Sequence, residues 1–304
     1  MANDHYPRVR VYSEGGHLLI RDGLSMTFYM RHVHEQIARG IRQSLDAYQD
    51  ALGADALGLY PDLEGEWQKL DAAGWSRILD KFQRKGRTRI HLADASARES
   101  RYLFKYHGSS FEPLPWARDT SRWVSAVSFW LPTEYLEEQG PSRVRELAME
   151  LAAPLPFCSG HAGLSLNCET DLVGVESVVR AHASRYPGMD IPHPFLHSWD
   201  LGTKVDGVHW LNFLGPPVLD ELGGLAGLQA HLHSPGTIVQ DMDEGRALIT
   251  LGPHPDAGDT EQGRTLPSYR ELARLLESVL YRRQDARSRE VPEQIRLWER
   301  RFLD

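Results

Sequence analysis

The sequence is poor in cysteine and has no long apolar run. Cys158 and Cys168 are the only cysteines among 304 residues, and a chain of this length can bury a core without a disulfide. We expect reduced, buried thiols, although the spacing alone leaves a disulfide open. No stretch approaches the roughly 20 apolar residues that a membrane-spanning helix needs. Since the N-terminal residues also lack the features of a secretory signal, we expect a soluble, cytoplasmic protein.

Positive charge is also in deficit. The chain has 34 Lys and Arg against 42 Asp and Glu, a formal net charge of −8, which disfavours general binding to nucleic acids or anionic membranes. Acidic residues gather in the segments 46–71 and 220–261, whereas basic residues gather around 77–89 and 270–301. This segregation is typical of an acidic face that attracts a basic partner, but solvated helix faces and loops produce the same pattern.

What is present is an ordinary globular composition with alternating helix and strand signals. Apolar residues recur at steps of three or four over 33–52, which predicts a long amphipathic helix. Segment 122–131 has apolar residues on both faces, as in a central strand covered on both sides. Further helices are predicted at 64–85, from Pro141 to about 151, at 171–183 with Asp171 as its cap, from Pro267 and from Pro292. Further strands are predicted at 8–12, 17–20, 24–29, 88–92, 101–106, 162–168, 208–214, 237–240 and 246–251.

The order of these segments defines the expected fold class. Strands outnumber clean strand–helix–strand crossovers, which favours an α+β fold with a mostly antiparallel sheet and amphipathic helices packed against it. We expect a single domain over residues 1–304, with a subdomain boundary near 109–120 as the alternative.

Histidines are plentiful, with 14 in the chain, so metal sites have to be considered. His231 and His233 form one candidate group, and His193, His197 and Asp200 form another. Neither has the spacing of a known zinc motif. Pro192 and Pro194 flank His193 and argue against a regular helical pair with His197. Ordinary polar histidines are the favoured interpretation, and we assign no metal ligand.

Nucleophile and phosphate motifs are equally weak. Cys158-Ser159-Gly160-His161-Ala162-Gly163 brings a thiol, a hydroxyl and an imidazole together, but it is not Gly-x-Ser-x-Gly and favours a turn that leads into a strand. The glycines of segment 223–227 lack the lysine of a P-loop. The loop 252–259 carries His254, Asp256 and Asp259 without evident further ligands. We therefore assign no catalytic and no cofactor-binding residue.

Several motifs nevertheless occur in an informative order along the chain. They are Trp123, Phe129-Trp130-Leu131-Pro132-Thr133-Glu134-Tyr135-Leu136, Gly140-Pro141, Leu155-Pro156-Phe157-Cys158-Ser159-Gly160-His161-Ala162-Gly163-Leu164, Trp210-Leu211-Asn212-Phe213-Leu214-Gly215, Gly223-Gly224, the loop 252–259 and Tyr269-Arg270. With them the chain resembles the bacterial family of type VI immunity proteins for VRR-Nuc effectors, from about residue 11 to residue 280. The aromatic residues of these motifs are more typical of a core than of a contact surface.

The resemblance implies a partner rather than a reaction. Members of this family are encoded beside antibacterial effectors delivered by type VI secretion and neutralise them by direct binding. The chain is thus expected to be an immunity protein, not an enzyme, whose partner is the cognate effector toxin, a DNA-cleaving nuclease encoded by the adjacent gene. No cofactor and no direct contact with nucleic acid or membrane are expected, and the oligomeric state is left open.

The acidic loops are the expected partner-binding surface, because a DNA-cleaving site presents positive potential that an acidic inhibitor can occupy. Two alternatives remain. One is a metal-dependent hydrolase that uses the histidine-rich and 256–259 loops; the other is a module that recognises an endogenous protein. The predicted partner-binding residues are Asp241, Asp243, Glu244, Asp256, Asp259 and Glu261.

Overall fold

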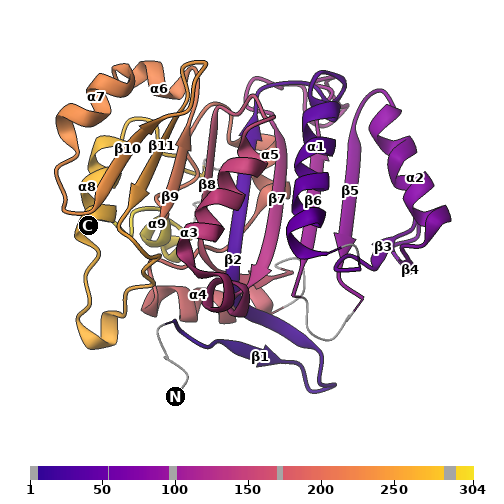
Figure 1. The fold of residues 1–304 in the computed structure, drawn as a ribbon, viewed down its shortest axis with the longest axis horizontal. Coiled ribbons are helices and arrows are strands. Elements are labelled where there is room, and N and C mark those ends of the chain that lie inside the picture. The colour runs from indigo at the N-terminus through magenta and orange to yellow at the C-terminus, as the bar shows by residue number, and fades with distance from the viewer. Residues whose placement is uncertain (1–5, 54, 96–100, 170–173, 284–291) are drawn as a thin grey trace.

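A large antiparallel sheet runs through the molecule (Figure 1). The computed structural model describes residues 6–53, 55–95, 101–169, 174–283 and 292–304, and within them eleven strands pair in the order β10-β11-β9-β8-β2-β7-β6-β5-β3-β4, with β1 paired to β2. The strands are β1 (Arg10–Tyr12), β2 (Leu18–Met30), β3 (Leu59–Pro61), β4 (Trp67–Lys69), β5 (Thr88–Ala93), β6 (Leu103–Gly108), β7 (Ser125–Pro132), β8 (Ser159–Cys168), β9 (Leu211–Leu214), β10 (Thr237–Asp241) and β11 (Ala247–Leu251).

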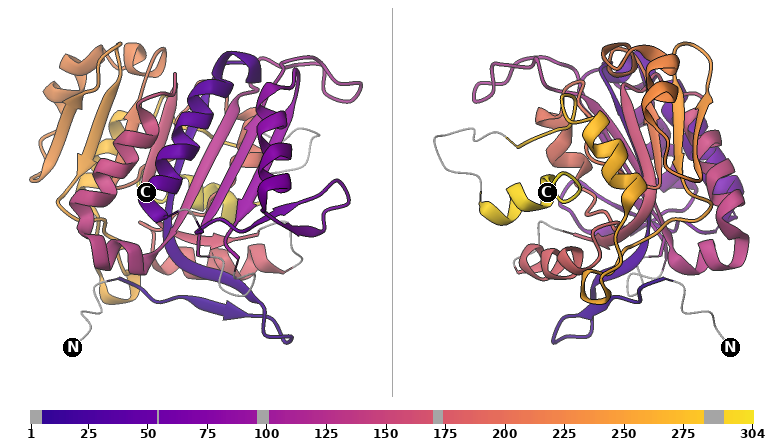
Figure 2. Two further views of the ribbon diagram at one scale, coloured as in Figure 1. Left: turned by 45° about the vertical axis from the view of Figure 1, so that its right-hand side comes forward. Right: turned by 90° about the vertical axis from the view of Figure 1, so that its left-hand side faces the viewer.

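Helices cover both faces of the sheet. In the right-hand view of Figure 2 the sheet separates α1 and α3 on one side from α8 and α9 on the other. The helices are α1 (His34–Leu52), α2 (Ala72–Gln83), α3 (Thr133–Ala152), α4 (Val175–Arg185), α5 (Pro194–Asp200), α6 (Val218–Glu221), α7 (Gly224–His231), α8 (Pro267–Leu275) and α9 (Glu293–Glu299), with a short 3-10 helix η1 (Thr260–Gln262). This arrangement confirms the predicted α+β class and the antiparallel sheet.

The centre of the sheet is buried from both sides. Every residue of β7 and β8 is buried, and β2 pairs with both strands over most of its length. The expected central strand at 122–131 is therefore confirmed as β7. The apolar stripe of the first helix also faces inward, since Ile37, Ile41, Leu45 and Tyr48 are all buried.

Two helices differ from the sequence prediction. The predicted helix 64–85 begins only at Ala72, because the carboxylate of Asp71 accepts the backbone N–H of Gly74 and caps it there. Trp67 lies instead in the exposed strand β4. The helix predicted to open at Pro141 does so, because Gly140, whose φ of 79° is not helical, separates it from a further helical segment that begins at Thr133; both belong to α3.

Other predicted elements end close to their expected positions. The strands predicted at 237–240 and 246–251 are β10 and β11, which pair as a hairpin. The helix predicted from Asp171 is described from Val175 onward as α4. Asp171 itself lies outside the described residues. Segment 109–120 joins β6 to β7, which pair directly with each other; the single domain stays a prediction. No helix in the described ranges is long and apolar enough to span a membrane.

Candidate functional site

The first acidic segment forms an exposed turn at the edge of the sheet. Asp241 ends β10, which is an outermost strand, and Asp243 and Glu244 lie in the turn that leads to β11. The backbone N–H of Asp243 donates to Asp241 Oδ1 over 3.0 Å, a side-chain turn that aspartate readily forms. All three acidic residues are exposed. We call Asp241, Asp243 and Glu244 the acidic hairpin.

Little positive charge of the chain itself offsets the acidic hairpin. Arg246 Nη2 lies 3.6 Å from a carboxylate oxygen of Glu244, whose side chain is 83% exposed. The other guanidinium nitrogen Nη1 of Arg246 donates to the carbonyl oxygens of Ala153 and Leu155. Within the described residues no cation pairs with Asp241 or Asp243. The hairpin therefore presents mostly uncompensated negative charge to solvent.

The second acidic segment is built differently, because its carboxylates face arginines. Asp259 is buried and accepts two hydrogen bonds from the guanidinium of Arg185, at 3.2 and 3.0 Å. These bonds with Arg185 lower the pKa of Asp259. The same arginine lies 2.7 Å from Glu261, and Asp256 pairs with Arg264 at 3.0 Å. Most of the predicted charge of this loop is neutralised within the chain.

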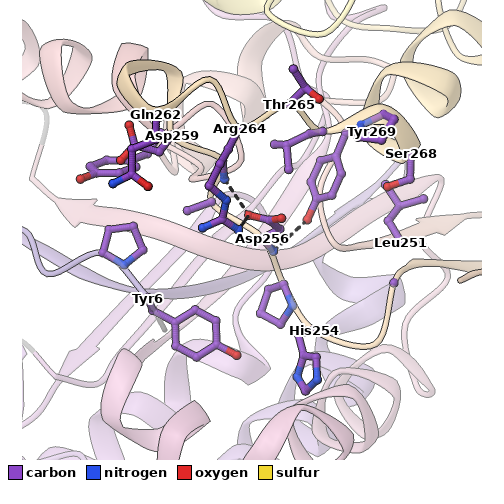
Figure 3. Close-up of a pocket in the computed structure, with 18 of the residues that line it drawn as sticks. Tyr6, Leu251, His254, Asp256, Asp259, Gln262, Arg264, Thr265, Ser268 and Tyr269 are labelled. Atoms are coloured by element: carbon purple, nitrogen blue, oxygen red, sulfur yellow. Dashed lines mark hydrogen bonds and ion pairs between the residues drawn. The ribbon is translucent and has the colours of Figure 1, made fainter. Parts of the chain in front are cut away.

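A pocket of about 540 Å³ lies beside this second segment. Figure 3 shows Asp256 between Arg264 and Tyr269, with Tyr6 and His254 on the opposite side. The backbone N–H of Asp256 donates to the hydroxyl of Tyr269, and that of Gly258 donates to the carboxylate of Asp256. These bonds fix the shape of the loop 252–259. Asp256 and Asp259 thus form a wall of the pocket rather than a free acidic surface.

A third polar region lies in the interior and is not apparent from the sequence. We call it the buried polar cluster; its members are Tyr29, His161, Asp190, His197, Asp206 and His209. The hydroxyl of Tyr29 donates to Asp206 over 2.8 Å, and His197 Nδ1 lies 3.1 Å from the same carboxylate. His161 Nε2 lies 3.2 Å from Asp190 Oδ2, and the His161 and His209 rings stack with centroids 3.8 Å apart.

Burial and neighbouring charge act in opposite directions on this cluster. Burial disfavours protonated His197, but Asp206 outweighs that effect and raises the pKa of His197. Burial lowers the pKa of His209 to about 3. Burial would raise the pKa of Asp190, but its interactions with His209 and His161 outweigh that effect and lower it. Asp190 is therefore a buried carboxylate that stays charged.

The histidine groups considered from the sequence do not assemble into ligand sets. His231 and His233 are exposed, and His231 Nδ1 contacts the carbonyl oxygen of Gly227. His193 precedes α5, where Pro194 occupies the first turn rather than preventing a helix, and its ring is 6.3 Å from that of His197. Asp200 accepts the hydroxyl of Tyr281. Among the residues described, one group of three potential metal ligands occurs, namely His161, Asp190 and His209.

The two cysteines are free and buried, as expected. Burial raises the pKa of the Cys158 thiol, and burial raises that of Cys168 to about 12. Ser159 donates its hydroxyl hydrogen to the carbonyl oxygen of Lys204. The predicted turn at 158–163 is instead the first half of β8. Neither thiol is thus held in the reactive thiolate form.

The fold and its surfaces define an α+β protein with a broad antiparallel sheet and an acidic hairpin at one of its edges. The sequence model of the family TsiV, described as type VI immunity for VRR-NUC, matches residues 40–302. The chain therefore belongs to this family of type VI immunity proteins, which confirms the resemblance inferred from its motifs.

Comparisons with solved structures support the fold. A chain of the Pseudomonas aeruginosa T6SS protein PA0821 superposes with a TM-score of 0.77 and is 19% identical in sequence. The alignment covers 99% of the present chain and 89% of the other. At that identity the likeness establishes a shared fold. A comparison with curated proteins gives no match.

Proposed function

We propose that this immunity protein neutralises a cognate type VI effector of the nuclease class by direct binding, in the cytoplasm and without catalysis of its own. The observation that carries the proposal is the acidic hairpin, whose Asp241 and Asp243 have no cationic partner among the described residues. Charge left uncompensated on an exposed turn is available to a partner.

The chemistry of the hairpin fits a nucleic-acid-cleaving partner. An enzyme that binds DNA holds positive potential in its substrate site to neutralise phosphates. Three carboxylates within four residues present a compact anionic surface, and the bond from Asp243 N–H to Asp241 Oδ1 restrains their spacing. Such a surface accelerates encounter with a basic site and orients the complex.

The edge strand beside the hairpin adds an apolar contact. Ile238 of β10 is 55% exposed, and β10 is paired on one side, by β11. Exposed edge strands are established docking elements for protein partners. We place the core of the effector contact along β10 and the acidic hairpin. We assign Asp256 and Asp259 to the pocket wall and Glu261 to its ion pair with Arg185.

The hydrolase alternative finds less support. A cation at the 256–259 loop would compete with Arg185 and Arg264, which already hold Asp259 and Asp256. His231 and His233 lie on the exposed end of α7 and its following residues without a third ligand in the described part of the chain. Arg185 and Arg264 therefore neutralise the carboxylates that a bound metal ion would otherwise neutralise.

Co-expression tests the proposal. The chain is expressed in a sensitive bacterium together with the product of the neighbouring gene, and survivors are counted while any complex is recovered and its stoichiometry measured. We expect rescue and a stable one-to-one complex, with no rescue from an unrelated toxin. Toxicity that persists without rescue or complex contradicts the proposal for that pair. Recovery of an endogenous host protein in the absence of any toxin favours the regulatory alternative.

A further inference from the structure

Three side chains of the buried polar cluster have the composition of a metal site. His161, Asp190 and His209 each offer one ligand atom, and these atoms all lie within 4.8 Å of one another. All three residues are buried. Two imidazoles and a carboxylate are a donor set that first-row divalent transition metals bind.

The backbone holds each of these residues in place independently of any ion. His161 lies inside β8, between β2 and β9. Asp190 is fastened beside β8 by backbone hydrogen bonds with Leu164 and Leu166, both of 2.8 Å. The backbone of His209 exchanges hydrogen bonds with the side-chain amide of Asn212, at 2.9 and 2.7 Å. The site is thus preorganised by the sheet.

The protein alone leaves part of this site unsatisfied. His209 is 1% exposed, and its Nε2 has no hydrogen-bond partner among the described residues. A buried polar nitrogen without a partner is costly. The stacked His161 ring, 12° from parallel, supplies no such partner to its neighbour. To bind one ion together with Asp190, the two stacked rings would have to tilt away from parallel, since an imidazole binds a metal in its own plane.

The surroundings provide polar groups for an outer shell. Ser25 donates its hydroxyl hydrogen to Asp190 Oδ2 over 3.2 Å. Asp206 adds a second, largely buried carboxylate held by Tyr29 and His197. A cavity of about 30 Å³ borders Asp190 and Asp206, with Arg301 also in its lining, and does not reach His161 or His209. That volume is far too small for a substrate, which fits a structural ion rather than a catalytic one.

From this geometry we propose that His161, Asp190 and His209 bind one divalent transition metal ion with a structural role. The ion ties Asp190, in the segment before α5, and His209, in the segment before β9, to the central strand β8. This inference stands apart from the proposed effector contact, since it concerns buried residues and needs no partner.

The test uses Zn²⁺ with the full chain, free of any affinity tag. The protein is stripped with a chelator and dialysed, and zinc binding is followed by calorimetry and by metal analysis of the re-isolated chain. We expect one zinc ion per chain. At free zinc about 100-fold above Kd, Tm should rise by roughly 5 °C, because a ligand that binds only the native state stabilises it.

Variants locate the site. His209→Gln should abolish stoichiometric binding, and Asp190→Asn, which preserves shape, should weaken it by more than about tenfold, as even outer-shell substitutions commonly do. The double variant of His231→Gln and His233→Gln is the matched control and should bind like wild type. If the folded wild type takes up no stoichiometric zinc, the proposal is wrong whatever the variants do. Binding that survives Asp190→Asn unchanged, or that is lost in the control, also overturns it.

Discussion

Asp243 and Asp259 lie in tight acidic turns of similar chemistry, yet the two turns differ in what their carboxylates meet. In the first, Asp241 accepts the backbone N–H of Asp243, and in the second, Asp259 accepts that of Glu261, each over 3.0 Å. Among the described residues, only the second turn has an arginine bonded to the aspartate that accepts the turn's backbone N–H, because Arg246 of the first reaches Glu244 alone. Arg185 reaches Asp259 and Glu261 from the end of α4, whereas the hairpin turn projects from the sheet edge.

The comparison separates acidic residues that shape the fold from acidic residues that remain available to a partner. A carboxylate that is bonded to an arginine of the same chain is already neutralised, and a partner would have to displace that arginine to bind it. A carboxylate without a partner keeps its full attraction for an incoming cation. Equal charge density in the sequence therefore conceals two different roles.

The largest expected effect comes from reversing charge on the hairpin. The double variant Asp243→Lys and Glu244→Lys should slow association with the effector by roughly 10- to 100-fold at low salt, since steering by surface charge contributes that much to encounter rates. Asp241 is kept because its carboxylate holds the turn. Stopped-flow or biosensor association rates measure the effect, with Tm as a check on folding.

The opposite edge of the sheet supplies the matched control. Glu64 and Glu66 are exposed in the connection between β3 and β4, and β4 is the other outermost strand. Glu64→Lys with Glu66→Lys changes net charge by the same amount and should alter association by less than about threefold. Equal slowing in both double variants would mean that overall charge, not the hairpin, governs encounter. Unchanged rates in the hairpin variant would remove it from the interface.

Removing the arginine that holds Asp259 should change the stability of the protein rather than its binding to the effector. Arg185→Ala leaves the buried Asp259 without its guanidinium partner and should lower Tm by roughly 2–5 °C. Association with the effector should stay within about twofold of wild type. Thermal denaturation and the same binding measurement check both parts. If Arg185→Ala keeps the wild-type Tm but slows association, the loop contributes to effector binding rather than to stability, and the assignment is wrong.

The sequence predicts secondary structure well where local patterns suffice. Steps of three or four place the first helix, and apolar residues on both faces of one segment place β7. The prediction fails at 64–71, where Trp67 and Leu70 fit a helical stripe, but the Asp71 cap begins the helix later and leaves Trp67 in β4. The cap formed by Asp71 therefore sets the start of the helix, although the apolar periodicity extends further towards the N-terminus.

The sites are harder to predict because their residues meet only through the sheet. No spacing connects His161, Asp190 and His209, which come from β8 and from two separate loops. Likewise the acidic character of Asp259 is visible in the sequence, but its partner Arg185 lies 74 residues away. Charge and residue type are local properties, whereas pairing and burial depend on which strands become neighbours.

The smallest predicted effect concerns pH and distinguishes charge from shape at the loop. Asp259→Asn keeps an oxygen that can accept the backbone N–H of Glu261, so it should lower Tm near pH 7 by only about 2 °C. Because Arg185 lowers the pKa of Asp259, the wild-type carboxylate contributes stability above its unfolded pKa of about 3.9 and loses that contribution as pH falls through the lower folded value. The difference in Tm between wild type and variant should therefore hold from pH 7 to about 5 and shrink below about 4. Other carboxylates that titrate in this range affect both proteins and cancel in the difference.

Asp243→Asn on the hairpin is the control and should show no difference in Tm from wild type at any of these pH values. A difference for Asp259→Asn that persists unchanged to pH 3 would show that the amide disturbs the packing, and that the charge of Asp259 is not what holds this turn.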